Sequence, residues 1–370
     1  MNTLEQLNLG IVGAYRRGAS FKAACDHLDN VCIRAVCDTN IDGLEEAAHR
    51  LGAEERYVRY EDMLEQSELD AVIIATPMHL HVEQTIQALQ RDLHVLCEVT
   101  AAVSIDECRD LVTACKASKG LYMLAENCNY FRANLVVREL VHQGLFGTTY
   151  YADAEYLHNI KKLCETTPWR RTWQMGIDGI TYGTHALGPV LQWMPGDRVI
   201  SVCCAGSGHH YRDLHGELYA QDTSVMLGKM HRGGLVKIRA DLLSDRPSIT
   251  TAFQLQGTDG CFESARSRGG KDRIWLRSHC PDERTWLDVS ELEEEFLPPV
   301  WRDVSEAAQQ AGHGGSDFFI FLDFVSAIEE GRSPSIGIHE AMDMTLPGLV
   351  SQESIGRGGE WMEVPDSRLW

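Results

Sequence analysis

The chain has 370 residues, of which 44% are hydrophobic, so it is long enough for about two domains with buried cores. Its 54 acidic residues outnumber 34 basic residues, and the formal net charge of -20 argues against a nucleic-acid partner, which binds largely through basic side chains on phosphates. No apolar run has the length of a membrane span and the N-terminus has no signal-peptide pattern, so we expect no membrane partner and a cytoplasmic location.

The cysteines are consistent with that location. All 12 are scattered along the chain and none forms a Cys-x-x-Cys pair, which indicates reduced thiols. The nearest approach to a metal-site pattern is Cys203 and Cys204 followed by His209 and His210, but adjacent side chains diverge on a strand. We therefore predict no metal site.

Strand and helix patterns alternate over the first third of the chain. The helix that we expect over 104–119 opens with Ser104 and Glu107 in the spacing of a capping box. Near-continuous apolar strands joined by helices predict a parallel sheet, and hence an N-terminal doubly wound α/β domain of the Rossmann type over residues 1–126. The expected strands are 7–13, 31–37, 70–76, 94–99 and 121–125, with a further helix at 79–91.

The pattern of predicted elements changes after residue 126, where longer strands follow one another with few helices between them. This pattern predicts an α+β second domain over residues 127–370, built on a mainly antiparallel sheet. Its expected strands are 148–158, 199–205, 223–230, 234–243 and 251–257, and its late helices are 317–330 and 339–355.

A possible dinucleotide-binding turn follows the first strand. Gly13 and Gly18 have the spacing of the first and last glycines of Gly-x-Gly-x-x-Gly, while Tyr15 stands at the middle glycine. Asp38 ends the second strand, where an acid accepts hydrogen bonds from ribose hydroxyls and repels a 2'-phosphate, so we favour NAD over NADP. The alternative is that the glycines merely form a turn and Asp38 caps a strand end.

Arg16 and Arg17 lie in the same turn. Either side chain could reach the pyrophosphate and compensate for Tyr15, or both could be exposed surface charges. The sequence leaves these two interpretations open.

With these pieces in place, the chain resembles the Gfo/Idh/MocA oxidoreductases nearly from end to end. The resemblance rests on the turn, on Asp38, on ATPMHLHVEQTIQAL (75–89) and on CEVTAAVS (97–104). It implies an N-terminal Rossmann domain, a C-terminal domain with an open sheet, a nicotinamide cofactor and sugar-like substrates. Carried over by position, the cofactor-binding residues are Thr76, Pro77, His81 and Glu98.

One departure from the family is chemically important. Most of these dehydrogenases read Glu-Lys-Pro where this chain has Glu98-Val99-Thr100, so the lysine beside the nicotinamide is missing. A valine side chain neither donates nor accepts a proton, so acid-base chemistry has to come from other residues.

The middle of the chain resembles one branch of the family, the NAD-dependent hydrolases of glycoside hydrolase family 109. This resemblance adds Asn127 to the cofactor-binding set. The matching strings are EVTAAVS, ENCNY (126–130), AEYLHN (154–159), PWRRTW (168–173), TYGTHALGPV (181–190) and HGGSDFF (313–319).

Two tyrosine and histidine pairs are candidates for the chemistry. Tyr156 and His158 alternate on a predicted strand, and Tyr182 and His185 are three apart on a predicted helix, so each pair should share a face. By resemblance, His185 takes a sugar hydroxyl proton, Tyr156 takes the neighbouring carbon-bound proton, and Tyr182 completes the catalytic set. A tyrosine pKa near about 10 has to be lowered for that role; the alternative is that Tyr156 is a core residue.

The predicted substrate-binding residues combine aromatic faces with hydrogen-bonding groups that suit a sugar. Trp169, Arg170 and Trp173 could instead form an interdomain plug, and Asp317 could simply cap a helix. The full set is His158, Trp169, Arg170, Trp173, His313 and Asp317.

The leading hypothesis is an NAD-dependent enzyme that exchanges hydride with a ring secondary hydroxyl, predicted to be that on C3, of a sugar or glycoside. The net reaction would be redox-neutral glycoside cleavage by oxidation, elimination, hydration and reduction. The alternatives are a plain NAD(P)-dependent sugar or inositol dehydrogenase and a non-catalytic NAD-responsive regulator. The expected partners are a small-molecule sugar or glycoside and further copies of the chain, as a dimer or tetramer formed through the second sheet.

Overall fold

The computed structural model describes residues 6–247, 249–302 and 311–370. Within them, the chain forms two compact units: 6–127, 311–342 and 367–370 belong to the first, and 128–247, 249–302 and 343–366 to the second. The sequence places one division near residue 126. The structure adds that the chain returns to the first unit late in the sequence, while the functional roles assigned to the two parts stay predictions.

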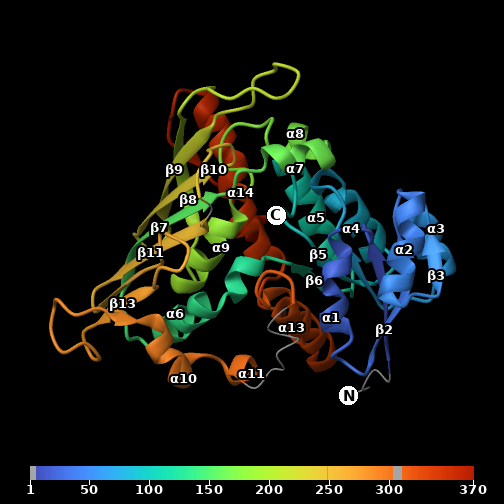
Figure 1. The fold of residues 1–370 in the computed structure, drawn as a ribbon, viewed down its shortest axis with the longest axis horizontal. Coiled ribbons are helices and arrows are strands. Elements are labelled where there is room, and N and C mark those ends of the chain that lie inside the picture. The colour runs from blue at the N-terminus through green and yellow to red at the C-terminus, as the bar shows by residue number, and fades with distance from the viewer. Residues whose placement is uncertain (1–5, 248, 303–310) are drawn as a thin grey trace. The chain divides into compact units, whose positions relative to one another are not determined.

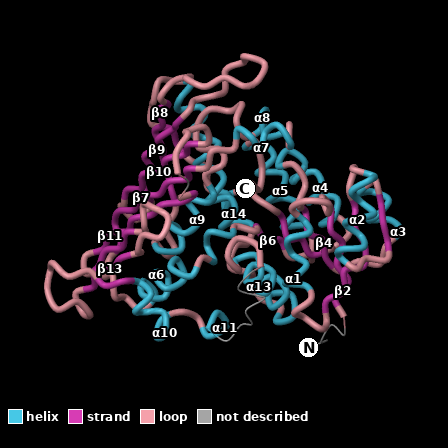
Figure 2. Tube along the Cα trace, viewed as in Figure 1, coloured by secondary structure: helices cyan, strands magenta, loops and turns pink. Residues whose placement is uncertain are grey.

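The first unit contains a six-stranded parallel sheet in the order β3-β2-β1-β4-β5-β6 (Figures 1 and 2). The order reverses between β1 and β4, and doubly wound sheets bind dinucleotides at such a point. This confirms the predicted Rossmann fold and adds β3, a short strand with polar residues that the sequence analysis did not identify. The strands are β1 (Leu7–Val12), β2 (Val31–Cys37), β3 (Glu55–Tyr57), β4 (Ala71–Ile74), β5 (His94–Cys97) and β6 (Tyr122–Leu124).

Local signals explain where the helices of this unit begin. The Asn40 side chain accepts a hydrogen bond from Gly43 N and caps α2, and Ser104 caps α5 by accepting from Glu107 N. The Glu107 carboxylate accepts from Val103 N, one residue earlier than in a strict capping box. The helices are α1 (Lys22–Cys25), α2 (Ile41–Leu51), α3 (Tyr60–Gln66), α4 (His81–Leu89), α5 (Ile105–Ala117) and α13 (Ser316–Glu330).

Helix α13 is the late segment that packs into the first unit. It contacts α1 and β5, and the rings of Phe21 and Phe321 have centroids 6.5 Å apart. His27 meets Phe318 edge-on at 4.9 Å. The helix between Gly18 and Cys25, which follows the glycine turn, is therefore held against α13 by aromatic contacts.

The second unit contains a nine-stranded sheet in the order β14-β13-β12-β11-β7-β10-β9-β8-β15 (Figure 1). Strands β7 and β10 are parallel and the other pairs are antiparallel, which confirms a mainly antiparallel sheet. The strands are β7 (Thr149–Leu157), β8 (Val199–Gly206), β9 (Thr223–Met230), β10 (Leu235–Asp241), β11 (Thr250–Gly257), β12 (Gly260–Glu263), β13 (Arg273–Leu276), β14 (Leu287–Asp288) and β15 (Met362–Glu363).

Alternation along β7 separates the two faces of this sheet. Ala152, Ala154 and Tyr156 are buried on the face that contacts α9, whereas Asp153 and Glu155 pair with Lys237 and Arg239 of β10 on the other face. The helices are α6 (Arg132–His142), α7 (Lys161–Thr166), α8 (Trp169–Trp173), α9 (Thr184–Trp193), α10 (Glu293–Phe296) and α11 (Pro299–Arg302), and α14 (Ile338–Gly356) runs from the first unit into the second.

Among the described residues, no helix is both long enough and apolar enough to cross a bilayer.

Gly13 begins the turn after β1, and its backbone lies very close to the backbone that follows β4. Gly13 has a φ of +78°, and a Cβ built on it would lie 2.5 Å from the carbonyl oxygen of Ala75. Gly52 has a similar φ of +74°, but nothing lies within 4 Å of its Cβ position. The two glycines therefore have similar φ angles and differ in whether other atoms occupy the position of a Cβ.

We expect Gly13→Ala to destabilise the protein more than Gly52→Ala does. The left-handed backbone costs either alanine about 1–2 kcal/mol, and the clash with Ala75 adds to that cost only at position 13. Urea unfolding of the two variants beside the parent chain measures the difference. Equal losses in both variants would show that the close approach is not a constraint.

Candidate functional site

Two glycines shape the turn between β1 and the following helix. A Cβ on Gly18 would lie 2.6 Å from the Ile11 side chain and 2.9 Å from the oxygen of Gly13, and Gly18 N donates to that oxygen at 3.1 Å. Both predicted glycine positions thus have no room for a side chain. This is the compact turn that a dinucleotide phosphate site needs.

Tyr15, which replaces the middle glycine, directs its ring away from the turn. The ring lies so close to Gly43 in the first turn of α2 that a Cβ there would meet it at 2.6 Å. The peptide N–H groups of Arg16 and Arg17 have no hydrogen-bond partner among the described residues. These two donors fit a pyrophosphate, which peptide N–H groups of such turns commonly bind.

Asp38 follows β2 and holds the same turn. Its Oδ2 accepts from Tyr15 N at 2.9 Å, and its Oδ1 accepts from Asn40 N at 3.0 Å. Each carboxylate oxygen still has a lone pair that can accept from a ribose hydroxyl. The turn and Asp38 together therefore fit a dinucleotide.

Thr76 and Pro77 follow β4, and Glu98 follows β5, at the carboxyl edge of the parallel sheet where such folds bind ligands. His81 is fully buried, and its ring nitrogens lie 2.8 Å from Thr100 O and 2.9 Å from Thr76 O. Burial lowers the pKa of His81, which favours a neutral ring that donates to one of these carbonyls. His81 thus braces two loops, and its contact with a cofactor stays a prediction.

Asn127, the remaining residue of the predicted cofactor set, begins a short 3-10 helix (Asn127–Tyr130) three residues after the end of β6 and is buried. Arg16 is exposed, as one interpretation of the sequence expected. Their roles toward a cofactor stay predictions.

Arg17 is not a free surface charge. Its guanidinium donates to Glu98 Oε1 at 2.7 Å from Nε and to both oxygens of Asp317, at 2.6 and 2.9 Å. Burial opposes the charged form of Asp317, but Arg17 and His313 outweigh it and hold the pKa of that carboxyl well below its usual range. Two predicted cofactor residues and the predicted sugar ligands His313 and Asp317 therefore form one cluster inside the first unit.

The proposed catalytic side chains come together in the second unit. The ring of Tyr156, near the end of β7, lies 4.8 Å from that of His185 and 5.9 Å from that of Tyr182, centroid to centroid. The Tyr182 and His185 rings are 5.4 Å apart, and the Tyr156 hydroxyl oxygen is 2.9 Å from His158 Nδ1. Tyr156 and His185 are buried, so this polar cluster lies in an environment that strengthens its mutual interactions.

One local expectation about this cluster was wrong. The sequence analysis placed Tyr182 and His185 on one helical face, but α9 begins at Thr184 and Tyr182 lies before it, in the turn at Gly183. The two rings meet because the turn directs Tyr182 back toward the first turn of the helix. Helical spacing is not the cause.

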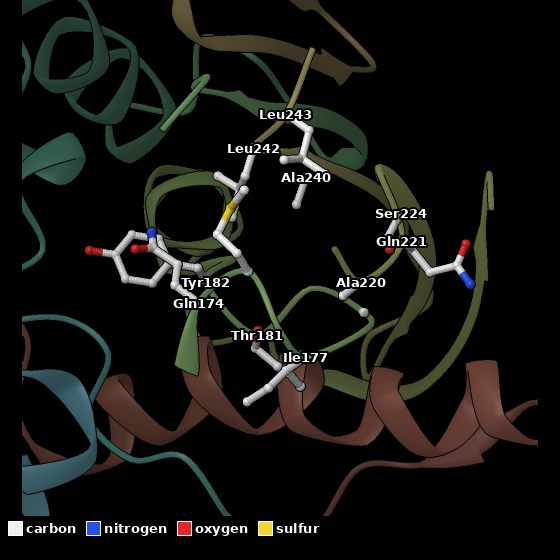
Figure 3. A pocket seen from close by; sticks show the side chains of 12 residues that line it. Gln174, Ile177, Thr181, Tyr182, Ala220, Gln221, Ser224, Ala240, Leu242 and Leu243 are labelled. Atoms are coloured by element: carbon white, nitrogen blue, oxygen red, sulfur yellow. The ribbon is translucent and has the colours of Figure 1, made fainter. Parts of the chain in front are cut away.

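A small pocket adjoins the cluster and shares Tyr182 with it (Figure 3). Its walls are mostly aliphatic, and Ser224 of β9 and Thr181 contribute hydroxyl groups. The sequence analysis did not identify it, because its lining comes from scattered segments without a motif. The lining residues are Gln174, Met175, Ile177, Gly179, Thr181, Tyr182, Ala220, Gln221, Ser224, Ala240, Leu242 and Leu243.

Helix α8 carries the predicted sugar-binding aromatic residues. Trp169, Arg170 and Trp173 are all half-buried, and the Arg170 guanidinium lies 4.4 Å from the Trp169 ring centroid. The unpredicted Arg171 donates to Asp213 at 2.9 Å and fixes the helix to the loop before β9. The contact between Arg171 and Asp213 therefore holds α8 in place on one side. Sugar binding by the aromatic residues of α8 stays a prediction.

Comparisons with known proteins agree over the length of the chain. Residues 7–126 match the family model of oxidoreductases with an NAD-binding Rossmann fold, and residues 130–368 match the C-terminal domain of glycosyl hydrolase 109. A glycosyl hydrolase family 109 protein of Saccharopolyspora erythraea is 29% identical, over 98% of this chain and 83% of its own length. An alpha-N-acetylgalactosaminidase of Shewanella oneidensis is 26% identical, over 98% of this chain and 85% of its own.

A solved structure shares the whole fold. Levoglucosan dehydrogenase in complex with NADH and levoglucosan superposes with a TM-score of 0.82 at 21% identity, covering 97% of this chain and 100% of its own. At this identity the likeness concerns the fold, which agrees with both sheets described above.

The position of Asp38 generates a test of cofactor choice. We expect Asp38→Ser to weaken NAD binding by roughly tenfold, because charged hydrogen bonds to the ribose are lost, and to improve NADP binding relative to NAD. Fluorescence titration with NADH and NADPH measures both. Asp42→Ser is the matched control, since Asp42 is an exposed acid in the first turn of α2. An unchanged preference in Asp38→Ser would contradict the assignment.

Proposed function

Because the chain belongs to the glycosyl hydrolase 109 branch of the Gfo/Idh/MocA oxidoreductases, an NAD-binding family, we propose that it cleaves glycosides through a redox-neutral cycle at the sugar ring. The observation that supports this proposal is the convergence of Tyr156, His158, Tyr182 and His185 in one cluster, in which Tyr156 and His185 are buried. An acid-base set of this kind suits a reaction with several proton transfers.

The first step is oxidation of a ring hydroxyl, which we assign to C3. His185 takes the hydroxyl proton, because histidine is the side chain best suited to proton transfer near neutral pH. The glycine turn and Asp38 would hold NAD, which would supply the hydride acceptor and donor of the cycle. The Tyr182 ring, 5.4 Å from the His185 ring, holds the imidazole in place on one side.

The second step is elimination. A ketone at C3 makes the C2 proton acidic, and Tyr156 removes it while the bond between C1 and its oxygen substituent breaks. The departing oxygen keeps the electron pair of that bond and takes a proton from solvent. We propose that the Tyr156 hydroxyl donates to His158 Nδ1, 2.9 Å away, so that His158 accepts the phenol proton when Tyr156 works as a base. This role differs from the sugar contact that the resemblance implied for His158.

The remaining steps reverse the first two. Water adds at C1 of the enone and releases one proton to solvent, Tyr156 returns a proton to C2, and His185 returns a proton to the C3 oxygen as the ketone is reduced. The cycle needs no lysine after Glu98, where this chain has Val99. Its proton transfers are assigned instead to side chains of β7 and of the segment that opens α9.

The substrate of this proposal is a glycoside bound against α8. Trp169 and Trp173 offer aromatic faces for a pyranose ring, and Arg170 offers donors for its hydroxyls. An alpha-N-acetylgalactosaminide is the first substrate to test, because a relative 26% identical to this chain carries that activity in its name.

We also propose that the chain forms a dimer or tetramer through the charged face of the second sheet, where Lys237 pairs with Asp153 and Arg239 with Glu155. Light scattering on the purified protein tests this assembly, and a monomer would exclude it. The cytoplasmic location stays a prediction from the sequence.

The two proton transfers can be separated with a substrate that cannot complete the cycle. A C-glycoside has no leaving group at C1, so the parent enzyme should produce NADH in a single turnover and stop. We expect His185→Asn to slow NADH formation by about 100-fold or more, because it removes the hydroxyl base. Stopped-flow absorbance at the NADH band measures this step.

Tyr156→Phe should leave NADH formation from the C-glycoside intact while slowing aglycone release from an aryl glycoside by about 100-fold or more. Tyr151→Phe is the control, since Tyr151 is on the same strand but on the opposite face of the sheet. Loss of both steps in Tyr156→Phe would contradict the division of roles. Accumulation of NADH with a keto sugar from the aryl glycoside would identify a dehydrogenase instead.

A further inference from the structure

The Arg17 cluster joins three distant parts of the first unit. The arginine comes from the glycine turn after β1, Glu98 from the end of β5, and Asp317 from the first turn of α13. Nε, Nη1 and Nη2 of the guanidinium all bind a carboxylate, and Nη1 also binds Ser20 Oγ at 2.5 Å. Asp317 is 0% exposed and the Arg17 side chain 25% exposed, so the carboxylate of this ion pair is shielded from solvent.

The segment before α13 is built to bring Asp317 to this position. His313, Gly314 and Gly315 have successive φ angles of +57°, +71° and +96°, and a Cβ on Gly312 would lie 2.2 Å from Asp317 Oδ2. His313 Nδ1 lies 3.1 Å from both Asp317 oxygens. His313 is the non-glycine residue among these three, and non-glycine residues adopt such positive φ angles only rarely.

From these contacts we infer that Arg17 and Asp317 are positioning residues for NAD, forming a clamp that fixes the glycine turn and the Glu98 carboxylate in their binding geometry. The inference rests on the NAD-dependent function proposed above. Carboxylates hold the Arg17 guanidinium on both sides, and this restrains the Arg17 backbone. The same restraint fixes the N–H groups of Arg16 and Arg17, which have no hydrogen-bond partner among the described residues. Asp317 then acts through Arg17 and makes no contact with the sugar.

A substitution that removes the charge of Asp317 distinguishes a positioning role from a purely electrostatic role. Arg17 faces two carboxylates, those of Glu98 and Asp317. Asp317→Asn removes one negative charge from the cluster and should tighten binding of the anionic dinucleotide if only electrostatics matter. If the clamp positions the turn, the same substitution should weaken binding, because the amide cannot replace the paired carboxylate.

The experiment measures NADH binding to the full chain without sugar, by energy transfer from tryptophan to the bound cofactor. Asp317→Asn and Arg17→Lys should each weaken NADH binding by about tenfold or more. The double variant should bind no more weakly than the weaker single variant, because both changes break one contact. Asp317→Glu, which keeps the carboxylate, should restore part of the affinity.

Asp323→Asn is the matched control, because Asp323 is also on α13 and its Oδ1 binds Arg332 at 2.9 Å, outside the Arg17 cluster. Unchanged or tighter NADH binding in Asp317→Asn would overturn the inference. Arg17→Lys keeps the positive charge and decides the question alone if Asp317→Asn does not fold. Because no sugar is present, failure of glycoside cleavage leaves this test unaffected.

Discussion

The alternation of side chains along β7 is the constraint on which the second unit depends. This strand pairs in parallel with β10 and antiparallel with β11, so its register is fixed from both sides. A slip of one residue would bring Glu155 into the apolar layer under α9 and expose Tyr156 among charged side chains. The same register that buries Ala152 and Ala154 thus also holds Tyr156 against His185.

The first unit depends on a different constraint, which is close backbone approach at the carboxyl edge of its parallel sheet. Gly13 contacts the loop after β4, Asp38 holds the turn through Tyr15 N, and Arg17 ties it to β5 and α13. These contacts restrain the turn before a cofactor binds. Such preorganisation lowers the free-energy cost of ordering the site on binding.

The sequence predicted the strands well where apolar periodicity was strong. Residues 31–37 and 223–230 form strands with the expected bounds, and the parallel first sheet followed from its strand and helix alternation. The sequence analysis missed β3, a three-residue strand, and the parallel pairing of β7 with β10, because periodicity carries no information about strand direction.

Motifs in the sequence predicted most residues of the candidate site, but they did not predict which of these residues contact one another. Arg17 and Asp317 are 300 positions apart, so nothing local links them. Tyr182 reaches His185 through a turn, and the adjoining pocket draws on scattered segments, which no spacing rule describes. Tertiary contacts of this kind follow from chain topology and not from local pattern.

The central claim is that a ring carbon is oxidised and reduced again within one turnover while the neighbouring C2 exchanges its proton. Proton NMR of an aryl glycoside with the enzyme and trace NAD in deuterated water tests this directly. The account predicts aglycone release, deuterium at C2 of the product sugar and no accumulation of NADH. Aglycone release with the C2 proton fully retained would contradict it, because direct hydrolysis at C1 never breaks that bond.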